Sequence, residues 1–143
     1  MSLAGTYDDA NLFAKILRGE LPAVKVHEDS DTLTFMDIFP QSRGHALVVP
    51  KDVRARNFID LPAEKVAPLM ARVHRVTKAV AKVLNPDGIA VVQFNGASAG
   101  QTVFHLHFHV IPRYDNAKLA GHHQNRADMA ELEALAKQIG AAM

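Results

Sequence analysis

Three histidines stand at alternate positions in one short stretch, TVFHLHFHVIPRY, which begins at residue 102. His105, His107 and His109 are separated by Leu106 and Phe108. In a β-strand, alternate side chains point to the same face, so the imidazoles would share one face and the apolar residues the other. Imidazole is a nucleophile, a proton carrier and a metal ligand near neutral pH, and it gains little from burial in an apolar core. The spacing therefore predicts chemistry on one face of a strand.

A loop with two glycines, NGASAG at residues 95–100, precedes the histidines. Small residues let backbone N–H groups approach a ligand closely, and successive amides form a positive concavity that suits a phosphate. The loop would bring Asn95, Gln101 and Thr102 to the end of the imidazole row, where they could hold a phosphate and a leaving oxygen. A glycine loop alone would be an ordinary turn, so this prediction depends on the neighbouring histidines.

Composition limits the class of protein. A chain of 143 residues suits a single domain, which we expect to span residues 1–143 with a core at about 9–114 and a tail at 115–143. Sixteen basic and fifteen acidic residues give a net charge of +1, which does not favour a nucleic acid polymer as partner. There is no cysteine and no apolar run of roughly 20 residues that could cross a membrane. Because no charged region followed by an apolar stretch opens the chain, a cytoplasmic location is expected.

Apolar periodicity predicts an α+β fold. A short helix should begin at Asp8 or Asp9 and end at Gly19, and Pro62 suits the first turn of one long helix. The other expected elements are strands at 23–28, 32–37, 45–50, 88–94 and 101–111, the long helix to residue 84, a loose segment at 115–127 and a final helix at 128–142. Short turns between successive strands predict a mainly antiparallel five-stranded sheet with its helices on one side, and Pro112 should end the histidine strand.

The histidine stretch resembles the motif of the histidine triad (HIT) family, in which histidine alternates with hydrophobic residues. The segment LFAKILRGELPAVKVHEDSDTLTFMDIFPQSRGHALVVPK is similar to the amino-terminal half of that family, and NGASAGQTVFHLHFHVIPR is similar to its active-site segment. Together with the helix between them, these segments cover residues 12–114. The resemblance implies the HIT fold and a homodimer.

The same resemblance implies a nucleotide hydrolase or nucleotidyl transferase that acts at an α-phosphate through a nucleotidyl-histidine intermediate. His107 would be the nucleophile, because a neutral imidazole nitrogen can attack phosphorus in line while the other nitrogen fixes the tautomer. His109 would contact the phosphate, and His105 would support the arrangement by hydrogen bonding. His45, in RGHALVVP, matches a fourth histidine near the other three.

The nucleoside end of the site is also implied by the resemblance. Asp37 matches the carboxylate that accepts hydrogen bonds from the two ribose hydroxyls. Four apolar residues match positions that line the base pocket, and three polar residues match positions that hold the phosphate and the leaving group. These residues are Phe13, Leu21, Phe35 and Ile38 for the base, and Asn95, Gln101 and Thr102 for the phosphate. Taken alone, the four apolar residues would be read as core.

The chain departs from the family at one place. Many bacterial members carry a structural zinc bound by two cysteines and a histidine, and the corresponding positions here are Asn11, Ala14 and Val53. None of the three offers a thiolate or an imidazole. We therefore expect no structural zinc and no other cofactor.

Three alternatives remain open from the sequence. The three histidines could bind a catalytic metal with an open fourth position, or the chain could be a nucleotide-binding regulatory module without turnover, or it could cleave dinucleoside polyphosphates. We favour purine nucleoside phosphoramidates or related adenylyl conjugates, because a polyphosphate leaving group would want a basic cluster. Apart from Arg113, the tail offers only the scattered bases Lys118 and Arg126. The IPRY stretch and a polar tail with His122 and His123 resemble general bacterial HIT hydrolases more than either specialised branch.

Overall fold

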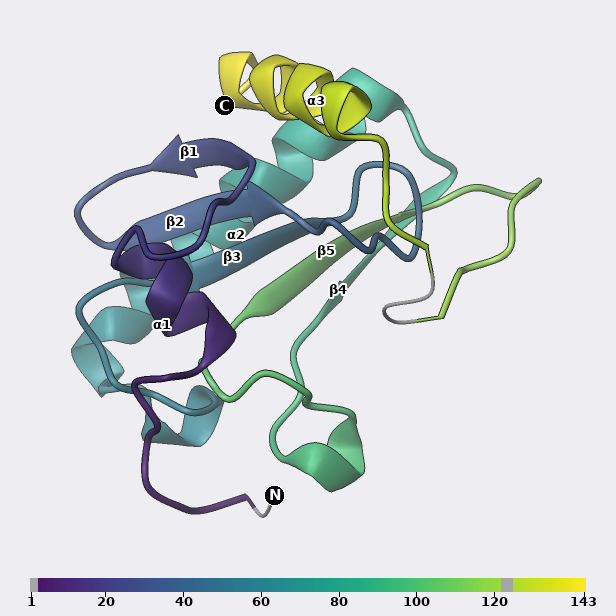
Figure 1. The fold of residues 1–143 in the computed structure, drawn as a ribbon. Helices are drawn as coiled ribbons and strands as arrows, with labels where there is room; N and C mark the ends of the chain where they lie inside the picture. Colours follow the sequence, from purple (N-terminus) through teal and green to yellow (C-terminus); the bar gives the residue numbers. More distant parts are fainter. Residues whose placement is uncertain (1–2, 122–124) are drawn as a thin grey trace.

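Within residues 3–121 and 125–143, which the computed structural model describes, five strands form one sheet in the order β1-β2-β3-β5-β4 (Figure 1). The strands are β1 (Lys25–Glu28), β2 (Thr32–Met36), β3 (Ala46–Pro50), β4 (Gly88–Val92) and β5 (Phe108–Arg113). All neighbouring strands pair antiparallel. The predicted α+β fold with a five-stranded antiparallel sheet is therefore confirmed.

The helices begin and end close to the predicted positions. They are α1 (Leu12–Leu17), α2 (Ala63–Leu84) and α3 (Met129–Ala141), with short 3₁₀ turns at Phe58–Asp60 and Ala97–Ala99. The N-cap of α1 is Asn11 rather than Asp8 or Asp9, because the Asn11 side chain accepts a hydrogen bond from the backbone N–H of Ala14. Gly19 follows the helix with φ of 78°, a conformation that a residue with a side chain rarely adopts. Pro62 lies one residue earlier than expected, at the N-cap of α2.

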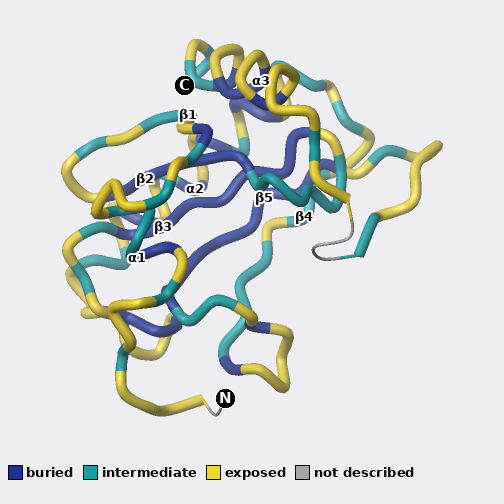
Figure 2. Tube along the Cα trace, in the orientation of Figure 1, coloured by how far each residue is buried: buried dark blue, intermediate teal, exposed yellow. Residues whose placement is uncertain are grey.

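The two faces of the sheet carry different helices. Phe35 and Leu47 belong to a cluster that packs against α1, whereas Met36 and Val48, their neighbours in sequence, belong to a larger cluster that includes α2 and α3. The expectation that all helices lie on one side is thus wrong for α1. Its single apolar stripe, centred on Phe13, covers the second face, which the other helices leave open. Figure 2 shows the buried central strands between these layers.

The histidine strand is shorter at its start and longer at its end than predicted. It begins at Phe108, so residues 101–107 are irregular, and it continues through Pro112 to Arg113. Pro112 pairs with Ile89 on β4, while the ladder between β3 and β5 extends only as far as Val110. Pro112 is therefore tolerated because its missing N–H would face the side on which β5 no longer has a partner strand.

The tail has no helix or strand in its described part, residues 115–121 and 125–127, as predicted. Two backbone hydrogen bonds hold it beside the segment that follows β2, from Ala120 to Gln41 and from Ala127 to Ile38. His122 and His123 lie outside the described residues. No helix in the described chain is both long enough and apolar enough to span a membrane.

Candidate active site

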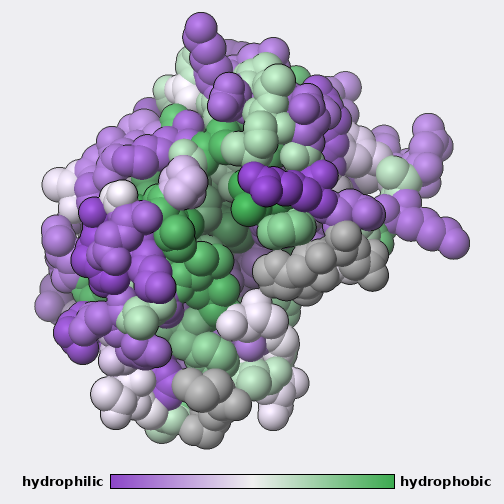
Figure 3. Space-filling model, viewed as in Figure 1, coloured by the Kyte–Doolittle hydropathy of each residue, from purple (hydrophilic) through white to green (hydrophobic). Residues whose placement is uncertain are grey.

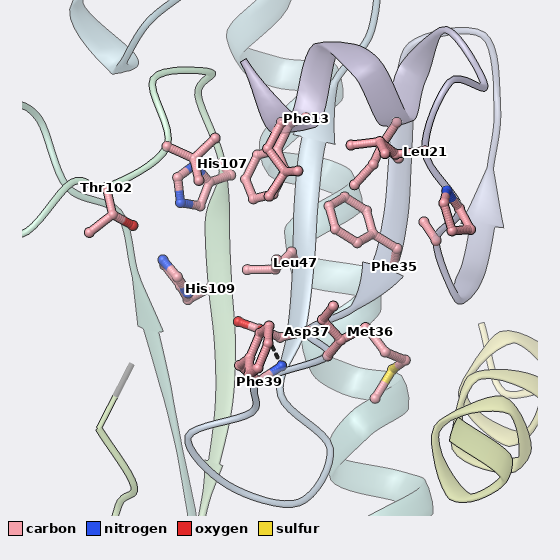
Figure 4. A pocket seen from close by; sticks show the side chains of 16 residues that line it. Phe13, Leu21, Phe35, Met36, Asp37, Phe39, Leu47, Thr102, His107 and His109 are labelled. Atoms are coloured by element: carbon pink, nitrogen blue, oxygen red, sulfur yellow. Dashed lines mark hydrogen bonds between the residues drawn. The ribbon is translucent and has the colours of Figure 1, made fainter. Parts of the chain in front are cut away.

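A cavity of about 260 Å³ opens on the face of the sheet that carries α1 (Figure 4). Its lining is mostly apolar and comes from α1, β2, β3, the segments that follow α1 and β2, and the histidine stretch. The lining residues are Leu12, Phe13, Ile16, Leu21, Pro22, Ala23, Phe35, Met36, Asp37, Ile38, Phe39, Leu47, Thr102, Val103, His107 and His109. Figure 3 shows hydrophobic side chains gathered at the centre of this face between more polar edges. The shape suits a ligand with one large apolar part and a few polar groups.

The structure brings most of the predicted site residues together. Eight of them line the cavity: Phe13, Leu21, Phe35, Asp37, Ile38, Thr102, His107 and His109. In Figure 4, Thr102 and the two histidines lie on one side, and Phe13, Leu21 and Phe35 lie on the other. His45 and His105 are behind this surface, where each contacts a motif histidine. Asn95 and Gln101 are outside the lining.

His107 is held in one tautomer by the backbone. Its Nδ1 lies 2.7 Å from the carbonyl oxygen of His105, and a carbonyl can only accept, so Nδ1 carries the proton. In the neutral ring, the Nε2 atom therefore carries the lone pair. The ring of Phe13 packs edge-on against the imidazole, with the ring centres 4.8 Å apart. His107 is thus an oriented imidazole at the cavity wall, and its neutral form has the Nε2 lone pair that a nucleophile requires.

His105 is almost fully buried, and both of its ring nitrogens are hydrogen-bonded. Its Nε2 lies 3.0 Å from the carbonyl oxygen of Pro50, so Nε2 carries the proton. Nδ1 must then accept, and the hydroxyl of Tyr7 donates to it over 2.6 Å. Burial lowers the pKa of His105, against the opposing effect of its bond to Pro50, and burial also raises the pKa of Tyr7. Both effects favour the neutral donor and acceptor that this bond needs.

His109 and His45 form a second pair whose protons can be assigned. The backbone N–H of Gln41 donates to Nδ1 of His45, so the proton of neutral His45 is on Nε2. This atom lies 2.9 Å from Nδ1 of His109, which therefore accepts. Neutral His109 must then carry its own proton on Nε2. With both rings neutral, the site therefore offers one lone pair, on His107, and one N–H donor, on His109.

Asp37 provides the carboxylate of the cavity. One oxygen accepts the backbone N–H of Phe39 at 2.8 Å, and the other lies 3.6 Å from Nε2 of His45. The side chain keeps 15% of its surface exposed. It lies beyond His109 as seen from His107 (Figure 4). A carboxylate at this position can accept hydrogen bonds from a ligand that also reaches the histidines.

Gln101 and Asn95 fix the glycine loop. The buried Gln101 side chain accepts from the backbone N–H of Gly96 and donates to two backbone carbonyls. The side-chain oxygen of Asn95 accepts two hydrogen bonds, one of them from the backbone N–H of Phe58. Of the three polar loop residues, Thr102 is the one that presents its side chain at the cavity (Figure 4).

The three motif histidines do not converge as metal ligands. Among the described residues, the group whose donor atoms lie within 4.8 Å of one another is Asp37, His45 and His109. A metal there would need the lone pair of His45 on Nε2, which requires the ring proton to be on Nδ1. That proton would then point at the backbone N–H of Gln41, which now donates to Nδ1. The hydrogen bonds thus fit a proton between these residues better than a metal.

The positions corresponding to the zinc site of related proteins are filled differently. Asn11 caps α1, Ala14 is buried behind it, and Val53 packs against the main core. No thiolate or imidazole stands at any of them, so these residues do not fit a zinc ion. The lack of a structural zinc stays a prediction.

Sequence reasoning missed half of the sixteen residues that line the cavity, including Leu47, and it missed Tyr7 behind the motif. Leu47 lines the cavity, and the signal was its alternate register with His45 on the same strand. Tyr7 contacts His105 from 98 positions away in the chain, and nothing in its local sequence indicates that contact.

The chain is similar to several known proteins. A HIT-like protein from Bartonella henselae, solved with an unknown ligand, is 45% identical with a TM-score of 0.91, covering 97% of this chain and all of that one. An adenosine 5′-monophosphoramidase of Schizosaccharomyces pombe is 43% identical over 71% of this chain and 73% of its own length. An adenylylsulfatase of Arabidopsis thaliana is 33% identical over 95% of this chain and 68% of its own. Residues 18–116 match the HIT domain, and the chain belongs to the HIT family.

Proposed function

We propose that the protein is a nucleotide hydrolase that cleaves purine nucleotide conjugates at the α-phosphate, through a nucleotidyl adduct on His107. The observation that carries the proposal is the 2.7 Å hydrogen bond that puts the lone pair of His107 on Nε2, at the wall of a cavity that also contains Asp37. Two relatives named as hydrolases of adenosine nucleotide conjugates, the phosphoramidase and the adenylylsulfatase, support this class of reaction.

Binding would divide the ligand between the two sides of the cavity. The base would pack among apolar side chains such as Phe13 and Phe35, and the ribose hydroxyls would donate to Asp37. The α-phosphate would then lie against His107, with Nε2–H of His109 as a donor to a phosphoryl oxygen. Thr102 adds a hydroxyl on the same side.

The reaction would proceed in two displacements. In the first, Nε2 of His107 forms a bond to phosphorus as the bond to the leaving amine breaks, and the amine takes one proton from water. In the second, a water molecule attacks the phosphorus and gives its proton to the hydroxide left by the first step, the bond to His107 breaks, and a nucleoside monophosphate leaves. Throughout, the carbonyl of His105 accepts from Nδ1 and stabilises the charge that His107 gains on attack.

Phosphoramidates, or related adenylyl conjugates, are proposed as better substrates than dinucleoside polyphosphates. No lysine or arginine is among the described residues that line the cavity. A polyphosphate leaving group carries several charges that a basic cluster would have to stabilise, whereas an amine departs neutral.

The test is to compare kcat/KM for an adenosine phosphoramidate and for diadenosine triphosphate on the same preparation. A higher value for the dinucleotide would reverse the assignment. Trapping the adduct by a quench without acid, followed by mass spectrometry, would place the nucleotide on His107. Tight nucleotide binding with neither turnover nor adduct would instead favour a regulatory binding module.

A homodimer is proposed as the assembly, as in the family that the chain resembles. In the described structure, β4 is a terminal strand of the sheet, and Val91 on it is 42% exposed. An unpaired strand edge with an exposed apolar side chain is a surface that proteins usually cover. Sedimentation equilibrium should give about twice the 15.6 kDa chain mass, and a mass of one chain would contradict the dimer.

A further inference from the structure

We propose that Tyr7 is a positioning residue for the nucleophile, because its hydroxyl fixes the ring of His105, whose backbone carbonyl orients His107. The inference rests on the proposed role of His107. Tyr7 is not among the described residues that line the cavity, so it would act through His105 and not on the substrate.

The first link is the hydrogen bond between Tyr7 and Nδ1 of His105, at 2.6 Å. The two rings also meet edge-on, with their centres 5.8 Å apart. On the other side of the imidazole, Nε2 donates to the carbonyl of Pro50. With a partner at each nitrogen, the ring of His105 has one favoured orientation and one favoured tautomer.

The second link is within His105 itself. Its carbonyl oxygen accepts from Nδ1 of His107, and the N–H of the same peptide group, on Leu106, donates to the carbonyl of Ala55. This peptide lies in the irregular part of the motif, where no strand ladder holds the backbone. The side-chain bonds of His105 therefore replace the ladder as the means of fixing the acceptor for His107.

The position of Tyr7 is itself determined by its surroundings. The guanidinium of Arg54 lies over the phenol ring, 5.3 Å from its centre. The side chain of Asn11, the N-cap of α1, is also a hydrogen-bond partner of Tyr7. Because Phe13 of the same helix packs against His107, the start of α1 contacts the nucleophile both directly and through Tyr7.

The test uses the only two tyrosines of the chain, Tyr7 and Tyr114. The hydroxyl of Tyr7 donates to His105, whereas that of Tyr114 donates to the backbone carbonyl of Arg43, outside the cavity lining. Tyr7→Phe removes one oxygen and should lower kcat about ten- to a hundredfold, since small displacements of a reacting group cost that much. KM and the Kd of a nucleoside monophosphate should stay within about twofold. Tyr114→Phe, the matched control, should change neither.

A second readout does not depend on turnover. Nitrogen-15 NMR of the histidine rings in the native protein should show the proton on Nε2 of His105 and on Nδ1 of His107. Tyr7→Phe should mix these tautomers, whereas Tyr114→Phe should not. Unchanged kcat and unchanged tautomers in Tyr7→Phe would overturn the proposal, as would a native His105 protonated on Nδ1, even if the variant did not fold. If the native protein shows no turnover, the proposed function fails, and the NMR result still decides the role of Tyr7.

Discussion

The histidine wall of the cavity, formed by His107 and His109 with His45 and His105 behind them, is held differently from the apolar wall, formed by Phe13, Leu21, Phe35 and Leu47. Each imidazole has at least one ring nitrogen in a directed hydrogen bond, to backbone, to tyrosine or to another histidine. The apolar wall is held by packing of aromatic and aliphatic side chains, such as the edge-on pair of Phe13 and Phe35.

This difference has a functional consequence. Hydrogen bonds fix the direction of a lone pair or a proton, whereas packing fixes mainly volume. Changes in the histidine wall should therefore alter the rate of the chemical step, and changes on the nucleoside side should alter affinity.

The largest expected effect is the loss of turnover in His107→Ala. Removing the attacking nitrogen should lower kcat at least about a thousandfold, because a covalent route cannot proceed without its nucleophile. The Kd of a nucleoside monophosphate, measured by calorimetry, should change little, since Asp37 and the apolar wall remain. His74→Ala, an exposed histidine on α2, is the control. Retained turnover in His107→Ala would place the nucleophile elsewhere.

The second effect belongs to the nucleoside side. Asp37→Ala should weaken the binding of a nucleoside monophosphate by about 1.5–3 kcal/mol, the usual value for a hydrogen bond to a charged group. The native protein should bind the 2′-deoxy nucleotide more weakly than the ribonucleotide. Asp37→Ala should bind the two nucleotides equally. Asp37→Asn keeps an acceptor for the N–H of Phe39, so its affinity for the nucleoside monophosphate should lie between those of the native protein and Asp37→Ala. Equal affinity of the native protein for ribose and deoxyribose forms would remove Asp37 from this role.

The contrast between the two walls also explains what the sequence could predict. Alternation and apolar periodicity depend on neighbouring residues, so they predicted the sheet and α2, whereas the family resemblance was needed to select Phe35 and Asp37 as site residues. They failed where the chain leaves regular structure, since His105 and His107 alternate with apolar residues but precede the strand. What orients these histidines is Tyr7 and the carbonyl of Pro50, and such long-range contacts leave no periodic signal.

The third effect is a dependence of stability on pH. Burial holds the pKa of His105 below its ordinary value, so the unfolded chain takes up a proton at a higher pH than the folded one. The contribution of neutral His105 to the free energy of unfolding is fully present above about pH 6.5 and is lost as the pH falls below that value. The free energy of unfolding should then decrease by at most about 1.4 kcal/mol per pH unit. The free energy of unfolding, measured with urea between pH 7.5 and 5.5, should depend less steeply on pH in His105→Gln than in the native protein, because glutamine cannot titrate. Parallel slopes would mean that His105 is not kept neutral in the folded state.

The smallest effect should be that of a chelator. The three positions considered for a structural zinc do not suit one, because Asn11 uses its side-chain oxygen to cap α1 and neither Ala14 nor Val53 offers a donor. Hydrogen bonds through Tyr7 and packing by Phe13 connect this region to the histidine wall instead. Incubation with EDTA, followed by its removal, should leave Tm and kcat/KM unchanged, and elemental analysis should find no stoichiometric zinc. One tightly held metal per chain, with activity lost on its removal, would show that the histidine wall depends on a metal after all.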